Sequence, residues 1–124
     1  MQAAKGMALT LTTRTVQPDI TVIELNGRVT LGKDSSQIEA FVLKALNEGS
    51  RKIVIDLAGL SYIDSSGIGI IAYCFAKIGQ AGAKATVAGA KGLVLEVFKV
   101  THLDTVIEFF PDVDTASARL SAAA

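Results

Sequence analysis

Hydrophobic and polar residues alternate along the first part of the chain in the manner of two β-strands. Residues 9–16 are rich in β-branched side chains, and residues 20–25 repeat the alternation after a Gln-Pro-Asp turn sequence at residues 17–19. A connection this short makes the two strands antiparallel. Asn26 and Gly27 follow, and we expect them to break or bend the second strand.

Farther along, the apolar residues recur at helical spacing. Asp34 or Ser35 is expected to cap the first helix, and Gly49 to end it. The apolar positions that define this helix are Ile38, Phe41, Val42 and Leu46. Residues 52–57 then form a short and almost wholly apolar run. This composition is typical of a strand that is covered on both faces.

The rest of the chain alternates between helical and strand patterns. In chain order these are a helix from about residue 65 to residue 79 or 80, a strand over 85–88, a helix over roughly 91–100, an edge strand over 106–109 and a last helix that Asp112 or Asp114 caps and that ends at Leu120. Such alternation requires crossover connections between mostly parallel strands. The predicted fold is α/β, with about four helices and a mixed sheet of four to five strands that opens with the antiparallel hairpin and continues in parallel.

Length and composition favour a single folded domain. The chain has 124 residues, of which 50% are hydrophobic, as expected of a globular domain rather than a disordered chain. We expect the domain to span residues 9–120. A flexible N-terminal tail over residues 1–8 and a C-terminal tail over residues 121–124 complete the predicted organisation.

The charge balance narrows the classes of partner. Lys and Arg together number 12, as do Asp and Glu, so the formal net charge is zero. Without a basic stripe along the sequence, we expect no binding to nucleic acid or to anionic membranes. The longest apolar run, residues 67–76, is about half as long as a membrane span, and residues 1–8 do not resemble a signal peptide. These observations predict a cytoplasmic protein without membrane insertion.

The sequence offers little material for catalysis or metal binding. One cysteine and one histidine, Cys74 and His102, cannot supply the usual zinc ligands, so we expect no metal site and no cofactor. Cys74 lies in an apolar run, which favours a buried and inert thiol. No general base accompanies Ser65, and the glycines at 67 and 69 lack the third glycine of a dinucleotide fingerprint. We therefore predict that the protein is not an enzyme.

The most informative segment lies between the apolar strand 52–57 and the helix 65–80. It contains Asp64, Ser65 and Ser66 at the carboxyl end of a predicted parallel strand, where α/β folds usually place binding sites. Unpaired N–H groups and the helix dipole make the first helical turn tolerant of a phosphate. A phosphate on Ser65 or Ser66 would add nearly two negative charges beside Asp64, enough to change partner binding about tenfold or more.

The same residues have a purely structural interpretation. Asp64 or Ser65 would then be an ordinary helix cap, with Gly67 and Gly69 as packing residues. Each glycine lowers helix propensity by about 1 kcal/mol, so close approach of the sheet or of a partner has to compensate for it. Taken alone, the tetrapeptide at 64–67 does not decide between the two interpretations.

The wider context resembles a known family. The strand 52–57 and the segment 59–69, Gly-Leu-Ser-Tyr-Ile-Asp-Ser-Ser-Gly-Ile-Gly, look like the hallmark of bacterial anti-sigma factor antagonists and of the wider STAS domain. The resemblance covers about residues 9–120 and includes Leu25-Asn26-Gly27-Arg28 before the first helix. It implies a STAS-like sheet, with Ser65 at the position of the phosphorylated serine and Ser66 as the alternative.

The resemblance also implies partners. The first is an anti-sigma factor that is also a serine kinase. The unphosphorylated protein binds this anti-sigma factor, so that a sigma factor is released. The second is a metal-dependent serine phosphatase, which removes the phosphate again. The implied partner-binding residues are Thr30, Tyr62, Ile63, Asp64, Ser65, Ser66, Gly67 and Ile68. The protein itself would be a monomer or a weak dimer.

The chain departs from the family pattern after the second strand. Many members carry Gly-Glu-Leu-Asp there, whereas residues 27–30 are Gly-Arg-Val-Thr, so an acidic position becomes Thr30. This departure from the family pattern leaves the identity of the partner open. Thr30 itself is either a plain loop residue or a second phosphosite. The alternative function is a STAS scaffold or accessory subunit of a transporter or signalling assembly in which Ser65 is never phosphorylated.

Overall fold

The computed structural model describes residues 8–30 and 32–122 and confirms the opening hairpin. β1 (Thr10–Val16) pairs antiparallel with β2 (Ile20–Val29), from Thr10 opposite Asn26 to Val16 opposite Ile20. β2 does not break at Asn26 as the sequence suggested. It continues for four residues past Leu25, with register shifts against its other neighbour on either side of Asn26 and Gly27.

Gly27 is the residue that permits this continuation. Its φ is +101°, and a Cβ atom there would lie 2.1 Å from the carbonyl oxygen of Ala8. Only glycine fits both the backbone conformation and the space. The backbone is therefore irregular at the position that the sequence indicated, but the irregularity is a bulge within the strand and not its end.

The five strands form one mixed sheet, in the order β1-β2-β3-β4-β5. β3 (Lys52–Ile63), β4 (Lys84–Ala88) and β5 (Phe109–Phe110) all pair in parallel, as the alternation of elements predicts. β3 is six residues longer than expected, because its second half pairs with the extension of β2. The edge strand expected over 106–109 is shorter and later, since a 3-10 helix occupies Leu103–Thr105 just before it.

The described ranges also contain four α-helices: α2 (Lys33–Asn47), α3 (Ser65–Gln80), α4 (Gly92–Val100) and α5 (Val113–Ala122). The cap expected for α2 is wrong, because Gly32 occupies the N-cap position and no side chain caps the helix. Asp112 caps α5, as its Oδ1 accepts from the backbone N–H of Thr115 at 2.8 Å. α5 includes Ser121 and Ala122, which were assigned to a tail, whereas residues 1–7 and 123–124 lie outside the described residues.

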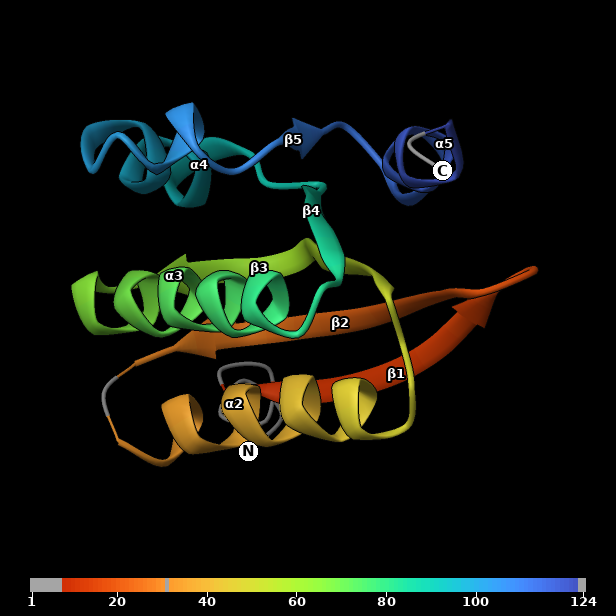
Figure 1. Cartoon of the computed structure of the whole chain (residues 1–124). Helices are drawn as coiled ribbons and strands as arrows, with labels where there is room; N and C mark the ends of the chain where they lie inside the picture. The colour runs from red at the N-terminus through yellow and green to blue at the C-terminus, as the bar shows by residue number, and fades with distance from the viewer. Residues whose placement is uncertain (1–7, 31, 123–124) are drawn as a thin grey trace.

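The helices cover both faces of the sheet (Figure 1). The larger apolar core joins alternate strand residues such as Ile53 and Ile55 to α2, α3 and α4. Val54, which points the other way, packs with Ala116 and Leu120 of α5. Within residues 8–30 and 32–122, no helix has the length and apolar character needed to cross a membrane.

Candidate functional site

The segment singled out from the sequence lies where β2 and β3 end and α3 begins. Val29 is the register partner of Ile63, and the backbone N–H of Asp64 donates to the carbonyl oxygen of Val29 at 3.3 Å. All three elements come together at the left of Figure 1. The carboxyl ends of two parallel strands and the amino end of a helix therefore form one edge of the molecule, as expected for an α/β binding site.

Asp64 is the N-cap of α3. Its Oδ1 accepts from the backbone N–H of Gly67 at 2.9 Å and from the Oγ of Ser66 at 2.7 Å, while its own backbone is extended. One carboxylate oxygen thus fixes both the first turn of the helix and the Ser66 hydroxyl. The structural interpretation of Asp64 is correct, and it leaves the role of Ser65 untouched.

The two serines differ in environment. Ser65 is exposed, and its side chain makes no hydrogen bond to any residue that the structure describes. Ser66 is half-buried, and its hydroxyl donates to Asp64. A modifying enzyme would reach the Ser65 oxygen directly, whereas it would first have to break the Ser66–Asp64 hydrogen bond to reach Ser66. The structure thus distinguishes two residues that the sequence could not.

The two glycines of α3 also differ. A Cβ atom at Gly67 would lie 2.6 Å from Cγ1 of Val29 and 2.7 Å from Cγ1 of Ile63. Gly67 therefore permits the close approach of α3 to the sheet that its low helix propensity suggested. Gly69 is exposed, and a Cβ atom there would meet nothing within 4 Å. Packing within this chain does not account for Gly69.

The other residues of the predicted partner surface fall into two groups. Ile63 and Ile68 are buried in the core with exposures of 3% and 4%, so they support the surface from beneath, and their contact with a partner stays a prediction. Tyr62 is half-buried, and the Arg28 guanidinium lies over its ring, 4.1 Å from the centroid. Thr30 is half-buried too, and its N–H and Oγ1 both donate to Asp34, at 3.0 and 3.2 Å.

The position of Thr30 bears on its proposed second role. A phosphate on Thr30 would replace the hydroxyl that now donates to the Asp34 carboxylate. It would place like charges in contact, which is unfavourable. We therefore retain Thr30 as a plain loop residue, and its contact with a partner stays a prediction.

Substitution of Asp64 tests the cap. Asp64→Ala removes the acceptor of both hydrogen bonds and is expected to lower the free energy of unfolding by about 1–2 kcal/mol. Asp64→Asn keeps an oxygen acceptor and should retain most of the stability. Urea denaturation followed by circular dichroism measures both variants. Equal stability of Asp64→Ala and the wild type would show that the cap contributes nothing.

Cys74 and His102 lie apart from this site. Cys74 is 2% exposed, and burial, with a smaller effect of the Glu39 charge, raises the pKa of its thiol to about 12. The expected burial of this thiol is thus confirmed. His102 is exposed in a left-handed backbone conformation at the start of the 3-10 helix. In the described part of the chain, no three His, Cys, Asp or Glu residues are grouped so as to hold a metal ion.

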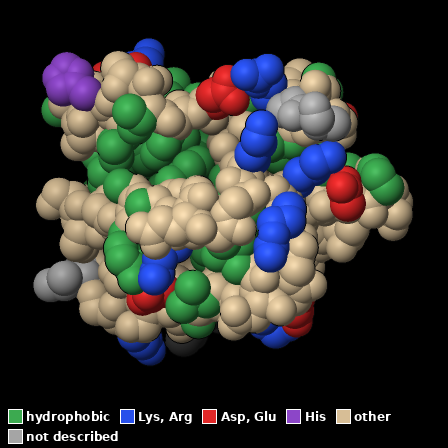
Figure 2. All heavy atoms as spheres, in the orientation of Figure 1, with side chains coloured by type: hydrophobic (Ala, Val, Ile, Leu, Met, Phe, Trp, Pro, Cys, Tyr) green, Lys and Arg blue, Asp and Glu red, His purple; other side chains and the backbone are tan. Residues whose placement is uncertain are grey.

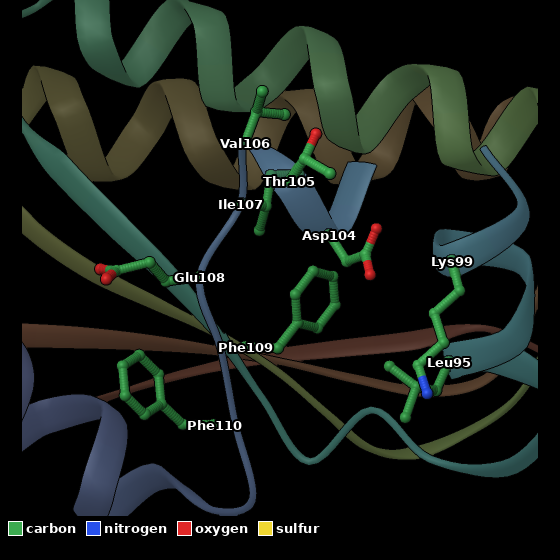
Figure 3. Close-up of a pocket in the computed structure, with 9 residues that line it drawn as sticks. All are labelled: Leu95, Lys99, Asp104, Thr105, Val106, Ile107, Glu108, Phe109 and Phe110. Carbon is green, nitrogen blue, oxygen red and sulfur yellow. The ribbon is translucent and has the colours of Figure 1, made fainter. Parts of the chain in front are cut away.

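A cleft of about 560 Å³ lies between α4 and β5 (Figure 3). Its lining residues are Leu95, Lys99 and residues 104–110. The Phe109 ring points into it, while Phe110 and Glu108 point to the other side of the strand. None of the residues singled out from the sequence lines this cleft.

A second feature that the sequence did not predict is a cluster of basic residues. Arg51, Lys52 and Lys84 come together where β3 and β4 begin, with Lys52 and Lys84 in register. Figure 2 shows Lys and Arg side chains gathered on the side of α5 and the hairpin turn. Lys52 lies 3.4 Å from Asp19, whereas Lys84 has no ion pair with any described residue. The sequence missed this cluster because strand pairing creates it, at the opposite end of the strands from Ser65.

Comparison with known proteins places these observations in a family. The STAS domain model matches residues 12–116. BtrV of Bordetella bronchiseptica, a candidate anti-sigma factor antagonist, is 29% identical over 91 residues, which are 73% of this chain and 73% of that protein. The crystal structure of an anti-sigma factor antagonist from Mycobacterium paratuberculosis has a TM-score of 0.82 at 18% identity, covering 92% of this chain and 95% of that one.

The anti-sigma factor antagonist SpoIIAA has the same fold in two forms. Its unphosphorylated form matches with a TM-score of 0.76 at 21% identity, over 91% of this chain and 97% of that one. The phosphorylated form of the Bacillus protein matches with a TM-score of 0.68 at 21% identity, over 89% and 98%. The mixed sheet and its four helices are therefore a shared architecture.

Proposed function

This chain belongs to the STAS domain family, and on that premise we propose that it is an anti-sigma factor antagonist whose binding is switched by phosphorylation of Ser65. The unphosphorylated chain binds an anti-sigma factor that is also a serine kinase, and a sigma factor is released. Phosphorylation of Ser65 ends this binding, and a serine phosphatase restores it. The chain is a cytoplasmic binding module in this scheme and not an enzyme.

The observation that carries the proposal is the exposed Ser65 hydroxyl at the first turn of α3. Asp64 holds the neighbouring Ser66 and the N–H of Gly67, so the helix start is rigid while Ser65 stays accessible. An exposed hydroxyl can enter a kinase active site and be aligned there with the nucleotide. This supports Ser65 over Ser66 as the phosphosite.

The chemistry is a simple phosphoryl transfer. The Ser65 oxygen attacks the γ-phosphorus of ATP held by the kinase, the bond to the β-phosphate oxygen breaks and ADP leaves. The hydroxyl proton passes to a base on the kinase. The phosphatase reverses the modification by hydrolysis, with water as the nucleophile and inorganic phosphate as the product.

The charge that phosphorylation adds explains why binding to the anti-sigma factor would weaken. At Ser65 a phosphate carries about −1.5 to −2 charges at neutral pH. The amino end of α3 tolerates this charge, so the fold persists. A partner that packs against the neutral hydroxyl would instead have to desolvate the phosphate, which weakens the complex. The switch therefore acts on the interface and not on folding.

Intact-mass analysis tests the phosphosite. The wild type, Ser65→Ala and Ser66→Ala are each incubated with the candidate anti-sigma kinase and ATP. We expect a gain of one phosphoryl group in the wild type and in Ser66→Ala, and none in Ser65→Ala. A gain that only Ser66→Ala loses would move the switch to Ser66. No gain with a kinase that nevertheless binds the chain would favour the scaffold or accessory-subunit function.

A further inference from the structure

Arg28 is a cation without an acidic partner among the residues that the structure describes. The ion pairs among the described residues are Arg14–Glu24, Lys44–Glu48, Lys52–Asp19 and Arg119–Glu108. The Arg28 guanidinium instead lies over the ring of Tyr62, with its Cζ atom 4.1 Å from the ring centroid. Stacking of this kind holds the planar group in place and leaves its edge N–H groups free to donate. The side chain is thus positioned for an anionic group that this chain does not supply.

The Arg28–Tyr62 pair lies at the same edge of the sheet as Ser65. The two residues are register partners, one position before Val29 and Ile63, which support the start of α3. The apolar cluster under α5 takes only Ile20 and Val22 from β2, at the other end of that strand. A partner covering the edge where β2 and β3 end would meet both Ser65 and Arg28.

A polar cleft of about 310 Å³ extends this surface. Its lining residues are Ala8, Leu9, Arg28, Thr30, Lys33, Asp34 and Gln37. Lys33 is exposed and makes no ion pair with a described residue. Asp34, the one acid in the lining, already accepts two hydrogen bonds from Thr30. The cleft therefore contains two cationic side chains, Arg28 and Lys33, that form no ion pair with a described residue.

We propose that the Arg28–Tyr62 pair and the Arg28–Lys33 cleft bind an acidic segment of the anti-sigma factor. This inference rests on the proposed function and adds the charge of the partner. Carboxylates match the guanidinium edge in bidentate geometry. The stacked ring has already restricted Arg28, so less side-chain entropy is lost when the partner binds. The charge complementarity selects an acidic partner over a neutral or basic one.

An acidic partner segment would also increase the effect of Ser65 phosphorylation on binding. A phosphate on Ser65 would face like charge on a partner that already carries carboxylates at this edge. We therefore expect phosphorylation to weaken the complex more at low salt than at high salt, because salt screens charges between solvent-exposed groups.

Charge reversal tests the inference. The affinity of unphosphorylated wild type, Arg28→Glu, Arg28→Lys and Lys33→Glu for the anti-sigma factor is measured by titration calorimetry at low and high salt. Arg28→Glu should bind about tenfold or more weakly at low salt, and the loss should shrink at high salt. Arg28→Lys keeps the charge without the planar stack and should lose less. Lys33→Glu should weaken binding in the same direction as Arg28→Glu.

Lys84→Glu is the matched control. It makes the same charge change at an exposed lysine without an ion pair, where β4 begins at the far end of the strands. It should bind as the wild type does, and thermal denaturation confirms that every variant is folded. An equal loss in Lys84→Glu, or none in Arg28→Glu, would overturn the inference while the proposed function stands. A folded wild type that binds no anti-sigma factor would overturn both.

Discussion

Gly67→Ala is expected to lower the free energy of unfolding by about 2 kcal/mol. The added methyl group would lie 2.6 Å from Val29 and 2.7 Å from Ile63, and both neighbours are fully buried and branched at Cβ. Their stiff side chains cannot move aside, so α3 has to shift away from the sheet. The cost exceeds the gain in helix propensity, which is about 1 kcal/mol. Chemical denaturation measures the difference directly.

Gly69→Ala is the matched control, two residues along the same helix. A Cβ atom meets nothing within 4 Å there, so only the gain in helix propensity remains. This variant should be more stable than the wild type by up to about 1 kcal/mol. If Gly67→Ala were equally stabilising, the close approach of α3 to the sheet would not constrain residue 67. If Gly69→Ala also weakened partner binding, the exposed face of α3 would be part of the interface.

Ser65→Glu is expected to separate binding from stability. A carboxylate at the first residue of α3 interacts favourably with the helix dipole, so the variant should be as stable as the wild type or slightly more stable. The same charge at the interface should weaken binding to the anti-sigma factor by about tenfold or more. Thermal denaturation and titration calorimetry on one preparation measure both effects.

Ser121→Glu is the control for this substitution. It adds the same charge at an exposed position of α5, on the other face of the sheet. Its affinity for the anti-sigma factor should match that of the wild type. Unchanged binding by Ser65→Glu would mean that charge at Ser65 does not control the interface. Reduced binding together with lost stability would mean that the effect comes through the fold.

Local patterns in the sequence were enough to predict which elements form and in what order. The alternation of 9–16 and 20–25 predicted the hairpin, and the helical spacing after residue 65 predicted α3, with its end left between residues 79 and 80. These features depend on interactions between residues close in the sequence. The mixed sheet followed from the order of the elements, because crossovers between strands make parallel pairs.

The errors concern long-range pairing. The ends of β2 and β3 look like turn sequences, with Asn26, Gly27 and Gly59 in them. Each extends as a strand because the other is beside it, and Gly59 leaves room for the Asn26 side chain. Neither extension is favourable without its partner, so no pattern within one segment predicts it.

The sequence predicted where the candidate residues lie in the fold, but it did not predict their contacts. The motif placed Asp64, Ser65 and Ser66 between a parallel strand and a helix, and they lie between β3 and the first turn of α3. It could not tell Ser65 from Ser66, because that difference is one hydrogen bond from Ser66 to Asp64. It also missed the Arg28–Tyr62 stack, which requires the register of β2 and β3.

The most direct test of the switch follows phosphorylation and binding in one sample. The complex of the unphosphorylated chain with its anti-sigma kinase is formed, ATP is added, and native mass spectrometry records both the complex and the phosphoryl content of the chain. We predict that wild type and Ser66→Ala leave the complex as they gain one phosphoryl group, while Ser65→Ala stays bound and unmodified. A wild-type chain that remains in the complex after full phosphorylation of Ser65 would contradict the account.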